Sequence, residues 1–153
     1  MRKYFLLLCL LFIGFSSCKK DSFNAAKQAA TDDALIQNYI SSNGIKATED
    51  PSGLYYEITN PGTGATPTTS STVTVTYTGS LLNGNIFAPT TTTTSVLSAF
   101  IKGWQIGLPH IAAGGTILLL IPSALGYGNS SPSIDIPDNS VLVFTITLTS
   151  FTN

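Results

Sequence analysis

The sequence predicts an α+β fold: an antiparallel sheet of five to six strands wrapped around one short helix, with an accessory helix before it. Two segments, residues 73–77 and 141–149, alternate apolar with polar residues as half-buried strands do. Residues 116–121 form an unbroken apolar run, which is typical of a central strand. Only residues 101–111 show helical spacing inside the domain, so we expect the sheet to dominate the fold.

Residues 1–17 predict a signal peptide. Arg2 and Lys3 form a short basic region, and residues 4–15 form an apolar core that is too short for a transmembrane helix. Small residues then precede Cys18, which resembles a bacterial lipoprotein signal and implies that Cys18 is lipidated. We therefore expect a protein of the bacterial cell envelope, lipid-anchored to a membrane at its periplasmic or outer-membrane face. An ordinary cleaved secretory signal with an incidental Cys is the alternative.

Residues 18–50 are expected to form a lipidated tether and a short helix. Residues 21–31 are polar and Ala-rich, which favours a tether, whereas Asp32 and Asp33 offer an N-cap and first-turn acids. The helix should end at Asn43 and Gly44. The remaining motifs all lie downstream of a turn at 49–53, so residues 51–153 are expected to fold as a domain of their own.

The rest of the chain alternates strands with turns. Residues 90–94 are a run of threonines, which we interpret as a solvated loop or an edge strand. Pro109 should shorten or kink the helix at 101–111, because it has no N–H to donate to the carbonyl of Gln105. The expected strands are residues 54–58, 73–77, 116–121 and 141–149, with turns or loops at 60–64, 67–71, 82–85 and 129–138.

Six short motifs follow one another through the domain, and most contain a large apolar residue at the end of an expected element. They are V-x-V-x-Y-T-G at 73–79, L-x-x-G-x-x-F at 81–87, I-x-G-W at 101–104, G-G-x-x-x-x-x-I-P at 114–122, Y-G at 127–128 and I-P-x-x-S-x-L-x-F at 136–144. None is specific alone, but their order and spacing resemble those of the FKBP-type peptidyl-prolyl cis-trans isomerases over residues 53–151. Together with the leader, the chain resembles the bacterial lipoprotein form of that family.

The resemblance implies an apolar pocket and a role for each residue in it. It assigns Trp104 to the floor of the pocket and the aromatic rings of Tyr77, Phe87 and Phe144 to its walls. Tyr127 is expected to supply a hydroxyl at the rim, and Ile101 a backbone N–H donor. These six are the expected catalytic residues. The expected substrate-binding residues are Leu97, Phe100 and Ile136.

The chain departs from the family beside the wall aromatic Phe87. Members usually have an Asp at the next position, where this chain has Ala88 followed by Pro89. That Asp lies against the pocket and orients its polar groups, so its absence is expected to lower activity or alter preference without abolishing prolyl binding. The stretch from Phe87 to Ile101 is also shorter than in small eukaryotic members and lacks one wall aromatic, and Leu97 is expected to fill part of that space.

The expected function is peptidyl-prolyl cis-trans isomerisation that assists the folding of exported proteins, by desolvating and twisting the X–Pro amide in the apolar pocket. Ala88 and the shortened stretch keep a second hypothesis open, a non-catalytic prolyl-peptide-binding module or chaperone on the same fold. A purely structural lipoprotein is the third. The expected partners are proline-containing polypeptides, the resemblance implies macrolide ligands, and we expect a monomer.

Composition argues against other classes of protein. Charged residues make up 10% of the chain and the net charge is −1, so no basic surface for nucleic acid is expected. Both cysteines, Cys9 and Cys18, lie near the N-terminus, which implies no disulfide framework. His110 has no suitable partner for nucleophilic catalysis, and Asp135 with Asp138 are too few ligands for a metal. No cofactor or metal is therefore expected.

Overall fold

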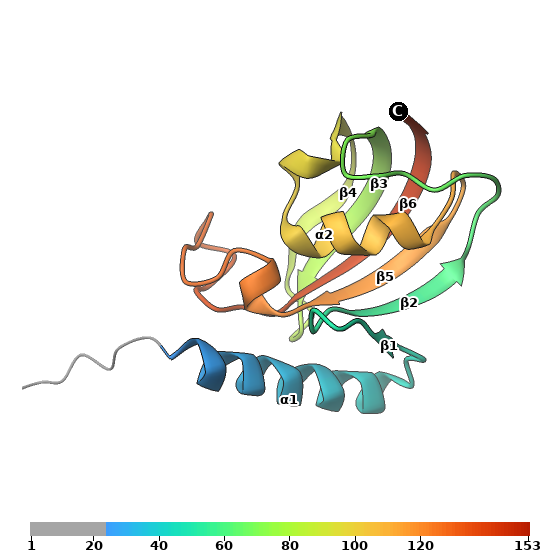
Figure 1. Cartoon of the computed structure of the whole chain (residues 1–153). Helices are drawn as coiled ribbons and strands as arrows, with labels where there is room; N and C mark the ends of the chain where they lie inside the picture. Colours follow the sequence, from blue (N-terminus) through green and yellow to red (C-terminus); the bar gives the residue numbers. More distant parts are fainter. Residues whose placement is uncertain (1–23) are drawn as a thin grey trace, which may run out of the picture.

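The computed structural model describes residues 24–153, so the predicted signal peptide and Cys18 lie outside the described residues. Six antiparallel strands form one sheet in the order β1-β2-β5-β6-β3-β4, and it curves around a short helix as predicted (Figure 1). No helix within residues 24–153 has the length and apolarity needed to cross a bilayer. The elements are α1 (Ala25–Asn43), β1 (Thr48–Glu49), β2 (Tyr55–Asn60), β3 (Thr72–Leu81), β4 (Ile86–Val96), α2 (Lys102–Gly107), β5 (Thr116–Ile121) and β6 (Leu142–Thr152), with 3₁₀ turns at Leu97–Ala99, Leu108–His110 and Ser123–Leu125.

The pairing of β3 with its two neighbours brings distant aromatic residues together. Gly79 on β3 lies opposite Phe144 on β6 and opposite Ala88 on β4. Successive side chains of a strand point to opposite faces, so Tyr77 and Gly79 share the face that looks towards α2. The β3–β4 register shifts between Gly79 and Ser80, so Phe87 has no partner in the regular pairing, and its ring lies beside that of Phe144 although the two residues are far apart in the sequence.

The threonine run belongs to the edge strand β4, which is one of the two alternatives that the sequence left open. Thr74 and Thr76 on β3 share side-chain hydrogen bonds of 2.9 Å with Thr94 and Thr92. Hydroxyl pairs of this kind stabilise adjacent strands and cover the outer face of the sheet without charge.

Helix α2 lies close to the sheet because two glycines face β5. A Cβ at Gly103 would lie 2.6 Å from Ile121 Cγ2, and a Cβ at Gly107 would lie 2.6 Å from Leu119 Cδ2. The helix is shorter than the predicted span of 101–111: it ends at Gly107 and passes into a 3₁₀ turn that contains Pro109. The missing N–H of Pro109 explains this, as expected from the sequence.

Helix α1 is longer than predicted and begins before the expected tether ends. Its N-cap is Asn24, whose Oδ1 accepts a hydrogen bond of 3.0 Å from the N–H of Lys27, so Asp32 is not the cap. The Ala-rich residues 25–31 are good helix formers, and the tether interpretation underestimated that propensity. Strand β1, which precedes residue 51, pairs with β2 and so belongs to the sheet.

The two helices cover opposite faces of the sheet. The main core, between the sheet and α2, contains Leu119 and Ile121 of β5. The neighbouring residue Leu120 points the other way and packs with Ile36 of α1 in a second cluster, together with Tyr55 and Val143. The accessory helix is therefore a packed layer of the fold.

Candidate active site

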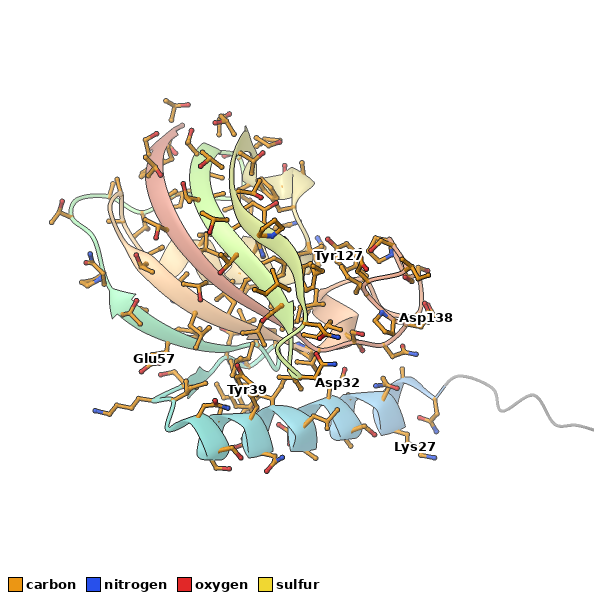
Figure 2. All side chains as sticks on the ribbon, turned by 180° about the vertical axis from the view of Figure 1, so that it is seen from behind. Lys27, Asp32, Tyr39, Glu57, Tyr127 and Asp138 are labelled. Carbon is orange, nitrogen blue, oxygen red and sulfur yellow. The ribbon has the colours of Figure 1, made fainter. Side chains whose placement is uncertain are left out.

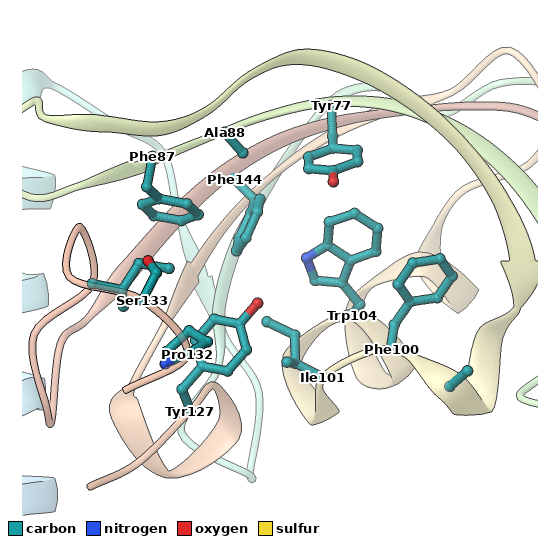
Figure 3. A pocket seen from close by; sticks show the side chains of 12 residues that line it. Tyr77, Phe87, Ala88, Phe100, Ile101, Trp104, Tyr127, Pro132, Ser133 and Phe144 are labelled. Carbon is teal, nitrogen blue, oxygen red and sulfur yellow. The ribbon is translucent and has the colours of Figure 1, made fainter. Parts of the chain in front are cut away.

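One pocket lies between the sheet, α2 and the loop that precedes β6 (Figure 3). Its volume is about 420 Å³, which is within the usual range for a ligand site. It is lined by aromatic and aliphatic residues and one serine: Tyr77, Phe87, Ala88, Ala99, Phe100, Ile101, Trp104, Tyr127, Pro132, Ser133, Ile136 and Phe144.

Trp104 forms the floor of the pocket and is only 3% exposed. Helix α2 carries it, and the ring contacts three other aromatic rings. Tyr77 and Phe144 meet it edge-on at centroid distances of 4.9 and 5.2 Å, and Phe100 stacks on it at 4.8 Å. Edge-to-face and stacked pairs at these distances add stabilisation beyond that of burial, so they favour this position of the Trp104 ring.

The wall formed by Phe87 and Phe144 depends on Gly79. These two rings pack edge-to-face at 5.5 Å, and both lie directly over Gly79 of β3. A Cβ on Gly79 would be 2.6 Å from Phe87 Cε2 and 2.7 Å from Phe144 Cε1. The rings can therefore occupy these positions only because residue 79 has no side chain.

Four polar groups of the described pocket have no hydrogen-bond partner among residues 24–153. Trp104 Nε1 is buried without an acceptor, and none of the hydrogen bonds within the described part of the chain involves the Ile101 N–H or the hydroxyls of Tyr77 and Tyr127. Figure 3 shows the Tyr127 hydroxyl directed into the pocket from its rim. Burial, with a smaller contribution from Tyr77, raises the pKa of Tyr127, so this hydroxyl stays protonated and can donate.

The loop on the far side of the pocket is held by its own polar groups. Asp138 Oδ1 accepts a hydrogen bond of 2.9 Å from the N–H of Ser131. The N–H of Asn139 donates to the carbonyl of Gly128 at 2.6 Å, which closes the base of the loop. Asp138 therefore has a structural role, and the described residues contain no group of three potential metal ligands.

The structure brings together eight of the nine predicted site residues: Tyr77, Phe87, Phe100, Ile101, Trp104, Tyr127, Ile136 and Phe144. Leu97 is the exception, because it is completely buried in the main core and does not line the pocket. Its expected wall position is thus corrected to a core position. His110 stacks on Tyr56 at a centroid distance of 4.4 Å and does not line this pocket.

Sequence reasoning did not assign Ala99, Pro132 and Ser133 to the pocket, although they line it. Pro132 and Ser133 belong to the predicted Ser- and Pro-rich loop, and only the position of Ile136 in the same loop indicated that it borders the site. Ala99 follows Leu97 in a 3₁₀ turn that the local pattern did not predict.

The chemistry open to this lining is limited by the lack of charge. None of the lining residues is acidic, basic or a histidine, so the lining itself supplies no general acid–base pair. The pocket can exclude water, hold an apolar ring between aromatic faces and donate hydrogen bonds to carbonyl oxygens.

Comparisons with known proteins agree with this geometry. Residues 64–149 match the family model described as FKBP-type peptidyl-prolyl cis-trans isomerase. The chain is 39% identical over 130 residues to the "Outer membrane protein MIP" of Legionella longbeachae, an alignment that covers 82% of this chain and 55% of that protein. It is 36% identical over 129 residues to the isomerase FkpA of Escherichia coli, covering 82% of this chain and 47% of FkpA. The chain thus spans about half the length of the curated relatives it matches.

Solved structures show the same similarity. The crystal structure of FkpA from Escherichia coli has a TM-score of 0.70 at 33% identity, covering 83% of this chain and 62% of that chain. A peptidyl-prolyl cis-trans isomerase from Pseudomonas syringae has a TM-score of 0.72 at 25% identity, covering 86% and 98%.

Proposed function

Because the chain belongs to the FKBP-type peptidyl-prolyl cis-trans isomerase family, we propose that it catalyses the cis–trans isomerisation of X–Pro bonds in polypeptides that fold in the bacterial cell envelope. The observation that carries this proposal is the uncharged aromatic pocket with Trp104 as its floor. Its size suits one pyrrolidine ring and the flanking backbone.

The reaction needs desolvation more than proton transfer. Rotation about the X–Pro bond takes tens to hundreds of seconds unaided, over a barrier of about 20 kcal/mol. Amide resonance causes the barrier, and water stabilises the polar planar state. An apolar pocket removes that water and favours the less polar twisted state, so it binds the transition state better than either planar isomer.

Different residues of the pocket bind the proline ring and the carbonyl groups on either side of it. Trp104, Phe87 and Phe144 hold the pyrrolidine ring by its apolar faces, since their rings meet around the same space. The Ile101 N–H and the Tyr127 hydroxyl, which have no partner among the described residues, donate to the carbonyls that flank the proline. Both donors can be reached by a ligand, since Tyr127 is 36% exposed at the rim and Ile101 is half-buried.

An isomerisation assay with a proline-containing peptide tests the proposal. Wild type should accelerate the reaction, and Phe87→Ala or Phe144→Ala should lower kcat/KM about tenfold or more, because about 1.4 kcal/mol of lost transition-state contact is tenfold in rate. Phe151→Ala is the matched control: Phe151 lies on β6 like Phe144 and packs against the same core, but does not line the pocket. It should lose stability and keep its kcat/KM.

Two outcomes would contradict the proposal. Unchanged turnover in folded Phe87→Ala and Phe144→Ala proteins would place the site elsewhere. If wild type does not accelerate the reaction but a prolyl peptide or macrolide changes the fluorescence of Trp104, the pocket belongs to a non-catalytic binding module, the hypothesis that Ala88 favours.

We also propose that the protein is anchored to an envelope membrane through lipid on Cys18. The basic and apolar leader followed by small residues and Cys supports this, and one similar protein has the name outer membrane protein. Metabolic labelling with a fatty acid should mark the wild type and leave Cys18→Ala unlabelled. Equal labelling of both proteins would refute the anchor.

A further inference from the structure

A buried carboxylate ties helix α1 to the segment that carries the pocket rim. Asp32 is 1% exposed, and its Oδ2 accepts hydrogen bonds from the N–H of Ser123 at 2.9 Å and from its hydroxyl at 2.6 Å. Its Oδ1 accepts a third, from Gln28 Nε2 at 2.8 Å. Figure 2 shows Asp32 on the side of α1 that faces the rest of the molecule, opposite Lys27.

Ser123 in turn holds the residues on both sides of Tyr127. Its carbonyl oxygen accepts hydrogen bonds from the N–H of Gly126 at 3.0 Å and from the N–H of Gly128 at 2.8 Å. Tyr127 thus lies between two backbone groups that both bind Ser123. The carbonyl of Gly128 then accepts from Asn139, which fixes the base of the pocket loop.

Burial of α1 alone does not require a carboxylate at this position. A buried carboxylate is costly unless it is fully hydrogen-bonded, and an apolar side chain would cover the sheet without that cost. The three hydrogen bonds of Asp32 satisfy its charge and specify where Ser123 sits. A carboxylate, which is costly to bury, is therefore present where α1 meets the turn that supports Tyr127.

We propose that Asp32 is a positioning residue for the isomerase reaction: through Ser123 it fixes the turn that carries Tyr127, so helix α1 affects catalysis through this residue. This inference rests on the proposed function of the pocket. Small displacements far from the reacting bond can lower the rate about a hundredfold, so a displaced Tyr127 hydroxyl would affect catalysis although Asp32 never contacts the substrate.

The test compares two neighbouring aspartates of α1 in the full chain. Asp33 also joins the helix to the sheet, because its Oδ1 accepts a hydrogen bond of 2.6 Å from the Tyr55 hydroxyl, but no hydrogen bond joins it to Ser123. Asp32→Ala should lower kcat/KM between about tenfold and a hundredfold, whereas Asp33→Ala should keep the wild-type value. Asp32→Asn retains one oxygen acceptor and should restore most of the activity.

Two further readouts separate positioning from a general loss of stability. Hydrogen exchange at the amides of Gly126 and Gly128 should accelerate in Asp32→Ala and stay at the wild-type rate in Asp33→Ala. In a Tyr127→Ala background, Asp32→Ala should cost much less activity than in wild type, because coupled positions are not additive. If Asp32→Ala does not fold, Ser123→Ala, which removes only the hydroxyl partner, takes its place with a smaller effect in the same direction.

The results test the positioning role of Asp32 separately from the proposed isomerase function. Equal activity and equal exchange in the Asp32 and Asp33 variants would overturn the inference, as would an activity loss that is the same with and without Tyr127. If wild type shows no isomerase activity, the proposed function fails by itself. The exchange rates at Gly126 and Gly128 then still decide whether Asp32 holds the rim.

Discussion

Gly79→Ala should damage the pocket more than the fold. Gly79 lies in β3 with its missing side chain beneath Phe87 and Phe144, and it is not among the residues with positive φ, so alanine meets no backbone strain there. The added methyl group would lie 2.6 Å from Phe87 Cε2 and 2.7 Å from Phe144 Cε1. Carbon atoms in contact normally sit about 3.5–4.0 Å apart, so each ring has to move by about 1 Å.

The direction of that movement follows from burial. Phe144 is 3% exposed and packs against Trp104 at 5.2 Å, so it has little room to move. Phe87 is only half-buried, and it should swing into the pocket that it lines. Overpacking of this kind costs about 1–3 kcal/mol, which leaves an ordinary domain folded. A displacement of about 1 Å at the reacting centre can cost up to about a hundredfold in rate.

We therefore expect kcat/KM to fall at least tenfold in a Gly79→Ala protein that still unfolds cooperatively. Isomerisation of a prolyl peptide measures the first quantity, and denaturant unfolding measures the second. Ser80→Ala is the control, because the next residue of β3 points to the opposite face of the sheet. Wild-type turnover and unchanged Trp104 fluorescence in Gly79→Ala would show that the two rings do not define the site.

Three other predictions concern the pocket and the accessory helix. Ala88→Asp restores the carboxylate that the family usually has against the pocket, so kcat/KM should rise; an equal or lower value would show that this chain does not use that group. Burial and Tyr77 raise the pKa of Tyr127 above the ordinary value of about 10. The hydroxyl therefore stays protonated and kcat/KM should be flat between about pH 6 and pH 9, whereas a bell-shaped profile would indicate proton transfer. A chain that begins at residue 51 lacks α1 and β1 and exposes Tyr55, Leu120 and Val143, so it should melt cooperatively at a lower temperature; a melt without a cooperative transition would mean that the residues before 51 are required for folding.

Local pattern was sufficient for most of the sheet, whereas the position of the pocket followed from the resemblance to the family. The alternation around Tyr77 predicted β3, because a strand that is buried on one face repeats with a period of two. The unbroken apolar run at 116–121 predicted β5, because a central strand is buried on both faces. The order of the motifs placed Trp104, Phe87 and Phe144 in one site, and the structure brings their rings together. The spacing of aromatic residues along the chain is therefore informative once the strand order of the family is assumed.

Other features could not be read locally because neighbouring residues do not determine them. The helical propensity of residues 25–31 competes with their polarity, and only the observed N-cap at Asn24 places the start of α1. Leu97 is as apolar as a pocket residue should be, but the 3₁₀ turn directs it into the core. The apolar character of Leu97 cannot distinguish a position in the core from one in the pocket wall, since both bury the side chain.

By itself, the sequence determined an antiparallel α+β domain, because the periodicity of strands is a property of neighbouring residues. The order of the motifs added the resemblance to the family, and with it an uncharged aromatic site, while the lipoprotein-like leader stays a prediction. Only the tertiary structure showed which residues outside the pocket lining determine the positions of the residues that line it. Gly79 matters because two rings from other strands lie over it. Asp32 and Ser123 are 91 positions apart, and no pattern in either segment indicates that they meet. Such contacts depend on how the layers pack against one another, and packing appears only when the whole chain is folded.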